Sequence, residues 1–400
     1  MFKSRQFVIG AIISLVFFVI ALLGVHLDQV WTALLKANYV WLVPALALYF
    51  IGVGVRALRW RILLRPIIPA ISVKETFDVV VIGYMANDIL PARIGELVRA
   101  YILSLRKGVT KTATLATIVV ERIFDGITMI AFAAGAVLYI ILTDNDALIT
   151  GEDHKLGTFL TNLQVPAIII TIVFLVLLVV FLVIAASRSR MEKVINTALR
   201  FLPGRFRERA AKIAHSFIDG LGSLRSGRSL GAVLVLSLVA WLFETGMYFI
   251  IGNLGFDLRG ADGQPLPFYV YVLVCGVVNL GGLIPQGPGS LGVFEFIGQS
   301  VLVGAFGVGQ SQSISYVLVL HVALLLPITL LGIFYMTRQS IAYRDLVRLE
   351  ETRAAASEQA HELEGPLTDI ELVQEGRLPD EEQPMGRWTT DDRRQTTDDA

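Results

Sequence analysis

Charged side chains stand inside otherwise apolar stretches of this sequence, and the first group of them surrounds a helix breaker. The segment NDILPARIGELVR holds Asn87, Arg93, Glu96 and Arg99 around Pro91. A helix that restarts after Pro91 offers free backbone N–H groups and a positive dipole end, and Arg93 adds a bidentate donor. This pattern predicts a site for an anion such as phosphate. The alternative is that Glu96 only caps its helix and pairs with Arg93 or Arg99.

The second group, in VVERIFDGI, places Glu121, Arg122 and Asp125 within an apolar run. On a helix, Glu121 and Asp125 share a face at spacing i, i+4, and Arg122 and Asp125 at spacing i, i+3. Ionisable groups are costly inside hydrocarbon and face the interior of a helix bundle. Two interpretations stay open: the groups pair structurally, with Arg122 reaching Asp125 or Glu96, or they contact a substrate. Our hypothesis is that Arg122 faces a phosphate and the carboxylates hold it.

The third group lies in NLGGLIPQGPGSLGVFE, where Asn279, Pro285, Gly289 and Glu295 repeat the order Asn, Pro, Gly, Glu of the first segment. The prolines break a helix here, and the glycines allow close backbone approach. Glu295 is a lone carboxylate in this apolar stretch, so it either carries a proton or pairs with an arginine of the first segment. We predict that all three groups together form one substrate-binding site.

Several other polar and aromatic residues lie in the apolar stretches and are weaker candidates for a functional role. Glu244 is a candidate for a proton path, and His321 is interpreted as a histidine satisfied by a neighbouring carbonyl. Trp60 and Trp241 are interpreted as interfacial or packing aromatics. With one cysteine, Cys275, and no Cys/His cluster, we expect no disulfide, no metal and no cofactor. No catalytic motif is present, so no catalytic residue is assigned.

The elements that must position these residues are membrane-spanning helices. The chain of 400 residues is 54% hydrophobic and 17% charged, with a mean hydropathy of +0.66, whereas a soluble domain carries about 25% charged residues. Six apolar segments are long enough to cross about 30 Å of hydrocarbon. They are residues 7–25, 39–55, 112–142, 165–186, 230–251 and 314–336. The composition predicts an all-α polytopic membrane protein and excludes a soluble globular enzyme.

Two further apolar stretches, residues 76–104 and 267–307, are each broken near the middle by Pro and Gly. Their halves are shorter than the ~20 residues of a full crossing, which favours re-entrant hairpins over two-span hairpins, although both stay open. The flanking charges predict that the two hairpins enter from opposite sides. Matched chemistry at oppositely inserted tips is the pattern of an inverted-repeat transporter, so we predict an inverted repeat.

Lys and Arg in the short loops predict that both termini are cytoplasmic, in the cell (inner) membrane. The residues expected in loops on that side include Lys3, Arg5, Arg56, Arg59, Arg61, Arg65, Arg106, Lys107, Lys111, Arg338 and Arg344. Residues 188–228 read as a basic amphipathic connector on the inner leaflet. We expect a transmembrane domain over residues 1–340 and an acidic, largely disordered cytoplasmic tail over 341–400.

The strings NDILPARIGELVRAYIL (87–103), VERIFDG (120–126) and GLIPQGPGSLGVFE (282–295) resemble the lysylphosphatidylglycerol synthase transmembrane family. These flippase-like proteins are related to the membrane half of the multiple peptide resistance factor, and the resemblance covers roughly residues 5–340. It implies a membrane domain that moves a phospholipid or polyprenyl-linked lipid between leaflets. The chain departs from the bifunctional relatives, which carry a soluble aminoacyl transferase domain after the membrane half. We therefore expect no aminoacylation.

The leading prediction is a lipid flippase or lipid transporter whose partner is a membrane lipid with an anionic head group, and no nucleic acid. A membrane-embedded lipid-modifying enzyme of the transferase type, with Glu96, Glu121 or Glu295 as base, is the alternative. A non-catalytic partner of a separate lipid-modifying enzyme, docking through the acidic tail, is a third hypothesis.

Overall fold

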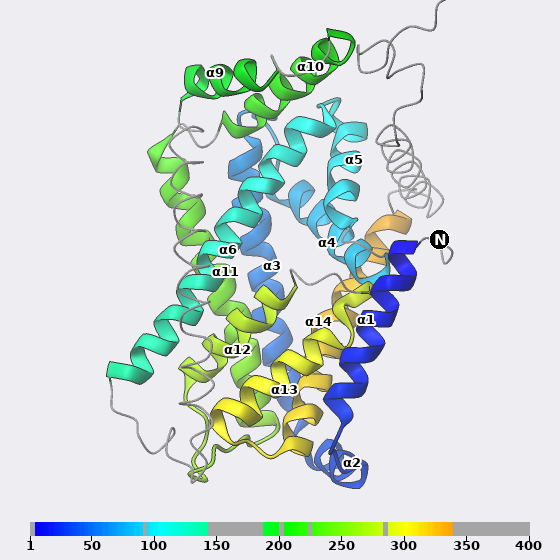
Figure 1. Ribbon diagram of the computed structural model, residues 1–400, viewed down its shortest axis with the longest axis vertical. Helices are drawn as coiled ribbons and strands as arrows, with labels where there is room; N and C mark the ends of the chain where they lie inside the picture. Colours follow the sequence, from blue (N-terminus) through cyan, green and yellow to red (C-terminus); the bar gives the residue numbers. More distant parts are fainter. Residues whose placement is uncertain are drawn as a thin grey trace, which may run out of the picture. The chain divides into compact units, whose positions relative to one another are not determined.

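The computed structural model describes residues 5–90, 94–142, 187–199, 204–222, 226–282 and 287–338. The chain divides into two compact units, Met1–Glu350 and Glu351–Ala400, and every described residue belongs to the first unit. Helices account for the regular structure of the described residues, and their arrangement is drawn in Figure 1.

The helices of the first half are α1 (Arg5–Leu22), α2 (Leu27–Lys36), η1 (Tyr39–Trp41), α3 (Leu42–Leu64), α4 (Val73–Ile89), α5 (Gly95–Lys107) and α6 (Lys111–Leu142). The described helices of the second half are α9 (Arg188–Leu199), α10 (Gly204–Gly220), α11 (Gly227–Phe249), η4 (Ile250–Gly255), α12 (Phe268–Gly281), η5 (Pro288–Ser290), α13 (Val293–Phe306) and α14 (Gln310–Arg338).

Five described helical segments are long and apolar enough to cross a membrane. They are Tyr39–Leu64, Lys111–Ile140, Gly227–Gly255, Pro288–Phe306 and Gln310–Arg338. A sixth is counted if α1 and α2, which are bent by 87° at the short break between them, form one span. These spans confirm the all-α polytopic class. The span predicted at 165–186 lies outside the described residues.

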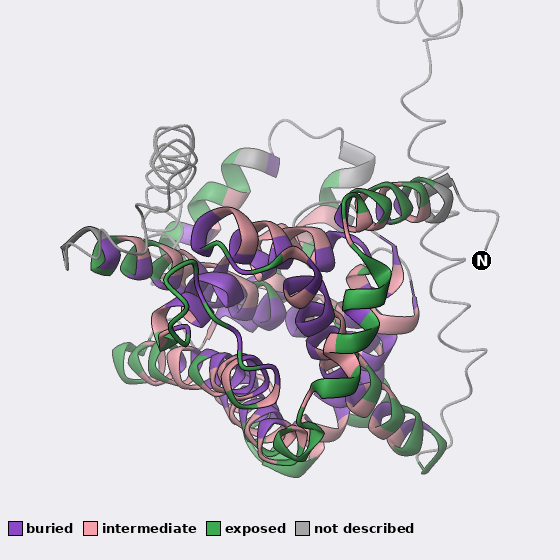
Figure 2. Ribbon diagram, turned by 90° about the horizontal axis from the view of Figure 1, so that it is seen from below, coloured by how far each residue is buried: buried purple, intermediate pink, exposed green. Residues whose placement is uncertain are grey.

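The burial pattern is that of a protein surrounded by lipid. Seen end-on in Figure 2, buried residues face the inside of the bundle and exposed residues face outward. Many outward side chains are large and apolar, such as Leu15 on α1 and Phe334 on α14, while charged groups such as Arg59 and Glu121 are buried. An apolar exterior around a polar interior suits a helix bundle in hydrocarbon.

The second span extends further than its apolar core predicts. It was expected to end at residue 55, with Arg56 and Arg59 in a loop, but α3 continues to Leu64 and buries both arginines. The helix continues because Leu63 and Leu64 pack in the core and because both guanidiniums find carboxylate partners inside the bundle. Arg56 and Arg59 therefore carry no information about membrane orientation.

The first hairpin consists of α4 and α5, which pack against each other. At 17 and 13 residues, the helices are about 25 and 20 Å long, shorter than the hydrocarbon layer. The two helices approach closely at a pair of glycines, because a Cβ on Gly95 would lie 2.0 Å from the carbonyl oxygen of Gly83. At the open end, Lys107 forms an ion pair with Glu75, and Glu75 completes a capping box with Ser72.

The second hairpin consists of α12 and α13, each 14 residues long. Its α13 arm starts at Gly292, which has φ +87° and lies so close to α1 that a Cβ would sit 2.0 Å from the carbonyl oxygen of Ser14. The Ser14 hydroxyl also accepts a hydrogen bond from the N–H of Gly287 at 2.9 Å. Helix α1 thus crosses the tip of this hairpin and fixes its backbone.

The tips of the two hairpins meet inside the bundle. Helix α4 packs against η5, and a Cβ on Gly289 would lie 3.5 Å from the carbonyl oxygen of Asp88. The hairpins come from opposite ends, with the α4–α5 hairpin near α10 and the α12–α13 hairpin near α2 (Figure 1). This arrangement agrees with hairpins that enter from opposite sides, and the inverted repeat itself stays a prediction.

Short helices cover the two ends of the bundle. Helix α2 lies at one end, at 87° to α1, with Leu27, Trp31 and Leu35 exposed along one face. Helices α9 and α10 lie at the other end (Figure 1), where α10 packs on α6. An amphipathic helix perpendicular to a span lies in the plane of the membrane interface.

Candidate functional site

A buried charge network joins four helices in the middle of the bundle. Its members are Arg56 and Arg59 of α3, Arg99 of α5, Glu121, Arg122 and Asp125 of α6, and Glu244 of α11. The residues of α5 and α6 were predicted from the sequence as site residues, and the structure brings Arg99, Glu121, Arg122 and Asp125 together.

Glu121 is the centre of the network because three guanidiniums converge on it. Its Oε1 lies 3.1 Å from both Arg59 Nη2 and Arg122 Nη2, and its Oε2 lies 2.7 Å from Arg99 Nη2. The Glu121 side chain is fully buried. Three cations around one buried carboxylate keep that carboxylate charged, since protonating it would leave the guanidiniums without a counter-charge.

Asp125 lies one helical turn further along α6 and shares two of these arginines. Its Oδ1 is 2.6 Å from Arg59 Nη1, and its Oδ2 is 3.3 Å from Arg122 Nη2. Oδ1 also accepts a hydrogen bond from the indole N–H of Trp241 at 2.9 Å. Arg59 donates in addition to the hydroxyl of Ser237 at 2.7 Å. Helix α11 therefore supplies neutral donors and acceptors that fix α6 against α3.

Aromatic rings lie against the arginines. The guanidinium carbon of Arg99 lies 4.0 Å from the centroid of Trp60, and that of Arg56 lies 4.4 Å from Trp241. The Trp60 indole donates to the hydroxyl of Thr117 at 3.0 Å. Cation–π contacts and hydrogen bonds of this kind stabilise desolvated guanidiniums. Trp60 and Trp241 were interpreted as interfacial or packing aromatics. The structure shows that they also contact the arginines of the charge network.

Glu244 pairs with Arg56, with 2.6 Å between Oε2 and Nη2 and both side chains almost fully buried. The sequence offered Glu244 as a proton-path candidate. This ion pair places Glu244 at the edge of the network, and its role in a proton path stays a prediction.

Arg122 differs from the other arginines of the network in its exposure. Its side chain is 38% exposed, whereas those of Arg59 and Arg99 are 0% and 2% exposed. Arg122 is the twelfth residue of α6, about 17 Å along a helix that starts at one end of the bundle. A partly exposed arginine side chain therefore lies at a depth where the surrounding helices span the membrane.

The first hairpin tip holds the remaining residues of the first motif. Asn87 caps α5, because its Oδ1 accepts the N–H of Gly95 at 2.7 Å. Glu96 is half-buried in the first turn of α5 and lies within electrostatic range of Arg122, whose ion-pair partners among the described residues are Glu121 and Asp125. Arg93 lies outside the described residues.

The second hairpin tip forms a separate cluster around Glu295. Its carboxylate accepts the N–H of Gly292 at 2.6 Å and contacts His321 Nδ1 at 2.6 Å, and His321 Nε2 lies 2.8 Å from the carbonyl oxygen of Gly289. Among the described residues, the side chain that contacts Glu295 is His321 of α14, and a pairing of Glu295 with Arg93 stays a prediction because Arg93 lies outside them. Asn279 is half-buried and donates to the carbonyl of Cys275.

The predicted single site is therefore two clusters, and Pro285 lies outside the described residues. The network residues that the sequence analysis did not place in the site are Arg56 and Arg59. The sequence feature that could have identified these two arginines is their i, i+3 spacing on a helix that continues into the apolar run around Leu63. His321 was expected to be satisfied by a carbonyl and does face that of Gly289, but its contact with Glu295, 26 residues away, was not predicted.

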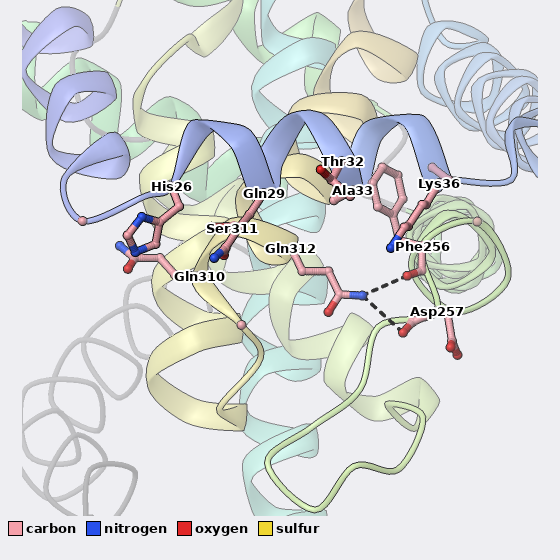
Figure 3. Close-up of a pocket in the computed structure, with 14 residues that line it drawn as sticks. His26, Gln29, Thr32, Ala33, Lys36, Phe256, Asp257, Gln310, Ser311 and Gln312 are labelled. Atoms are coloured by element: carbon pink, nitrogen blue, oxygen red, sulfur yellow. Dashed lines mark hydrogen bonds between the residues drawn. The ribbon is translucent and has the colours of Figure 1, made fainter.

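A polar cavity of about 690 Å³ lies at the α2 end of the bundle. Figure 3 shows His26, which precedes α2, and Gln29 and Lys36 of α2 lining it opposite Gln312 of α14. The Gln312 amide donates to the carbonyl of Phe256 at 3.0 Å. The cavity contains none of the motif residues. Among the described residues, no group of three or more His, Cys, Asp and Glu side chains is placed to hold a metal ion.

Comparison with known proteins identifies a glycosyltransferase and several UPF0104 membrane proteins as similar to this chain. The chain is 25% identical to the Glycosyltransferase AglD of Haloferax volcanii over 73% of this chain and 48% of that protein. It is 25% identical to a UPF0104 membrane protein of Methanothermobacter thermautotrophicus over 72% of this chain and 81% of the relative. A UPF0104 membrane protein of Pyrococcus horikoshii is 23% identical over 76% of this chain and 88% of the relative.

The chain thus spans about half of the length of the glycosyltransferase and most of the length of the two UPF0104 proteins. Residues 7–332 match the family described as the lysylphosphatidylglycerol synthase TM region. This match covers the described spans, both hairpins and the charge network. The chain is a multi-pass membrane protein that belongs to the lysylphosphatidylglycerol synthase transmembrane region family.

Proposed function

We propose that this protein is a lipid flippase or lipid transporter that moves a phospholipid or polyprenyl-linked lipid with an anionic head group between leaflets. The observation that carries the proposal is the partly exposed side chain of Arg122, at 38%, in an otherwise buried charge network. A charged group at this depth is costly unless it serves a pathway. A head-group phosphate is the ligand that a guanidinium binds best, through two parallel N–H···O bonds.

The charge balance of the network supports an anionic ligand. Direct contacts join four guanidiniums to three carboxylates, so one positive charge is unmatched among these seven groups. The Nε atoms of Arg59, Arg99 and Arg122 also have no hydrogen-bond partner among the described residues. Glu96, near Arg122, is then placed to limit how strongly the phosphate is held, which a transport site requires because the lipid must leave.

The hairpins provide the moving parts in this proposal. Helix α5 carries Arg99, and the α4–α5 tip contacts the α12–α13 tip. Rocking of one hairpin against the other would open the network alternately to each side, as in transporters built around broken helices. The protein would act in the cell membrane with both termini cytoplasmic, as the loop charges other than Arg56 and Arg59 predict.

The test is lipid exposure in proteoliposomes. Purified protein is reconstituted into phosphatidylethanolamine vesicles that contain fluorescent phosphatidylglycerol, and the fluorophore reached by an impermeant quencher is followed over time. We expect the wild type to accelerate exposure, and Arg122→Ala to slow it by roughly tenfold or more, the loss for one charge-assisted bond of ~1.5–3 kcal/mol.

Two variants make this test specific. Arg122→Lys retains the charge without the bidentate geometry, so it should be intermediate. Arg259→Ala removes an exposed arginine that pairs with Asp257 and should match the wild type. The proposal would be overturned if vesicles with and without the protein exposed the labelled lipid at the same rate for every anionic lipid tried, polyprenyl phosphates included.

A lipid-modifying enzyme is the second candidate, and the similarity to a protein named as a glycosyltransferase favours it. In that case the half-buried Glu96 beside Arg122 would be the base, since a carboxylate near a bound phosphate can accept a proton from an attacking hydroxyl. Incubation of the protein with a total lipid extract and an activated sugar donor, followed by mass spectrometry, separates the candidates. A transporter leaves every lipid mass unchanged.

A further inference from the structure

The His321–Glu295 pair is a buried titratable pair that lies outside the charge network. His321 is 3% exposed and Glu295 is 0% exposed. Their contact joins α14 to α13, with 2.6 Å between Nδ1 and Oε1. The ring of Phe294 stacks on the imidazole with 4.1 Å between centroids, which holds the ring in place. A carboxyl group and an imidazole are therefore in direct contact within the apolar bundle.

The hydrogen-bond partners determine how many protons the pair holds. His321 Nε2 faces the carbonyl oxygen of Gly289 at 2.8 Å, and a carbonyl only accepts, so Nε2 carries hydrogen. Glu295 Oε2 accepts the N–H of Gly292 at 2.6 Å. The short Nδ1···Oε1 contact then requires one more proton between the two atoms, since two lone pairs would repel at 2.6 Å.

That proton belongs to the pair. On the ring it gives an imidazolium beside a carboxylate, and on the carboxyl it gives two neutral groups, with zero net charge in both cases. Release of the proton to water leaves a neutral imidazole whose Nδ1 lone pair faces a carboxylate. The pair then has a charge of −1 and has lost the hydrogen bond that joins α13 to α14.

Among the described residues of the neighbouring elements, Asp88 is the titratable group that interacts with this pair. Asp88 of α4 lies within electrostatic range of His321, and its Oδ2 accepts the hydroxyl of Thr329 at 2.7 Å. Helix α1 contributes the uncharged Ser14, and Glu295 is the lone charged residue of α13. The charged residues of α2, such as Lys36, lie by the first turn of α14, about 16 Å from His321 along that helix.

We propose that His321 and Glu295 form a proton-binding site that couples lipid movement to the proton gradient. The pair holds the second hairpin to α14 while its proton is bound and frees the hairpin when the proton leaves. Asp88, half-buried at the tip of the first hairpin, is the neighbouring group through which the proton passes. The coupling role rests on the proposed transport function, whereas proton binding by the pair does not.

Glu295→Gln is the most informative variant, because it retains every hydrogen bond of the carboxyl group but has no titratable proton. The amide oxygen accepts the N–H of Gly292, and the amide N–H donates to Nδ1 of a neutral His321 that still donates from Nε2 to Gly289. The variant is therefore expected to fold and to keep the second hairpin bound to α14 at every pH. Asp257→Asn, a carboxylate-to-amide change at an exposed ion pair, is the matched control.

Proton binding is measured on purified full-length protein in detergent, without lipid movement. Infrared difference spectra between acidic and alkaline pH should show carboxylate and imidazole bands in the wild type and in Asp257→Asn. Glu295→Gln and His321→Gln should each lose the share of these bands that belongs to the pair, while the bands of the other carboxyl and imidazole groups stay. Identical difference spectra for the wild type and Glu295→Gln would overturn the proton site.

Coupling is measured in the phosphatidylglycerol exposure assay with a pH gradient imposed across the vesicles. The wild-type rate should change severalfold with the gradient and lose this response when a protonophore is added, whereas the Glu295→Gln rate should be independent of the gradient. A wild-type rate of lipid exposure that does not change with the pH gradient contradicts the coupling of lipid movement to protons. Absence of any lipid movement, together with the expected infrared bands, contradicts the transport function and leaves the proton site standing.

Discussion

Arg99 Nη2 lies 2.7 Å from Glu121 Oε2, and this contact fastens the first hairpin to α6. Both side chains are buried, and the Arg99 guanidinium lies on the ring of Trp60 of α3. This ion pair therefore links the first hairpin to α6. The first hairpin also contacts the second hairpin at its tip, and α6 carries Arg122. The position of the partly exposed Arg122 side chain depends on this contact.

Loss of the Glu121 charge should destabilise the protein strongly. Glu121→Gln leaves Arg59, Arg99 and Arg122 around a neutral amide, and breaking a buried ion pair on one side costs about 3–5 kcal/mol. We expect a clear fall in the thermal unfolding temperature of the detergent-solubilised protein. Glu244→Gln is the comparison, because Glu244 pairs with Arg56 alone and should cost less. Equal losses for the two variants would contradict the central place of Glu121.

The close approach of α4 and α5 predicts a second effect on stability. In Gly95→Ala the new Cβ would lie 2.0 Å from the Gly83 carbonyl oxygen, so the helices must separate at a cost of about 1–3 kcal/mol. Gly135→Ala in α6 is the control, since nothing lies within 4 Å of its added Cβ. Thermal unfolding should show a lower midpoint for Gly95→Ala and an unchanged or higher one for Gly135→Ala.

The open end of the first hairpin predicts a pH-dependent contribution to stability. Lys107, and then the backbone N–H of Ser72, lower the pKa of Glu75 from 4.5 to about 2. A carboxyl group whose pKa is lower in the folded state stabilises the fold above its unfolded pKa and loses this effect as pH falls through the folded value. The stability difference between wild type and Glu75→Gln should be complete at neutral pH, shrink below about pH 4.5 and vanish near pH 2.

Lys107→Gln should reproduce the Glu75→Gln profile, because it removes the first cause of the lowered pKa. The measurement is chemical unfolding followed by circular dichroism across this pH range. A difference that grows on acidification would contradict the assignment.

The position of α2 predicts where one tryptophan meets lipid. Trp31 is 64% exposed on a helix at 87° to α1, so it should lie at the membrane interface. Bromine placed near the head group of reconstituted lipids should quench a fluorescence component that Trp31→Phe removes. Trp60→Phe should leave this component intact, since Trp60 is fully buried. Stronger quenching from bromine at the chain ends would contradict an interfacial α2.

Most of the described spans and the α6 part of the charge network were predictable from the sequence, because both depend on patterns within one helix. Pro288–Phe306, which is long enough to cross, was instead expected to be half of a broken stretch. The i, i+3 and i, i+4 spacing of Glu121, Arg122 and Asp125 identifies their common face. The interhelical contacts were not predictable. Arg59 reaches Asp125 across 66 residues, and no local pattern encodes such a pairing.

The boundary of α3 shows why charges alone misplace a helix end. An arginine after an apolar run is expected in the polar head-group region, yet Arg56 and Arg59 are desolvated because carboxylates on α6 and α11 offset the cost. In the same way, Glu295 could not be assigned a partner from its own segment. His321 supplies that partner because α14 packs along α13.

The contact of Ser14 with Gly287 and Gly292 has a consequence for biogenesis. Helix α1 is synthesised before the segment that packs across it, which follows more than 270 residues later. A contact between such distant segments forms late, after synthesis has passed the second hairpin. Until then α1 has no settled neighbour at this position, and a chain halted before the second hairpin should be a ready substrate for membrane quality control.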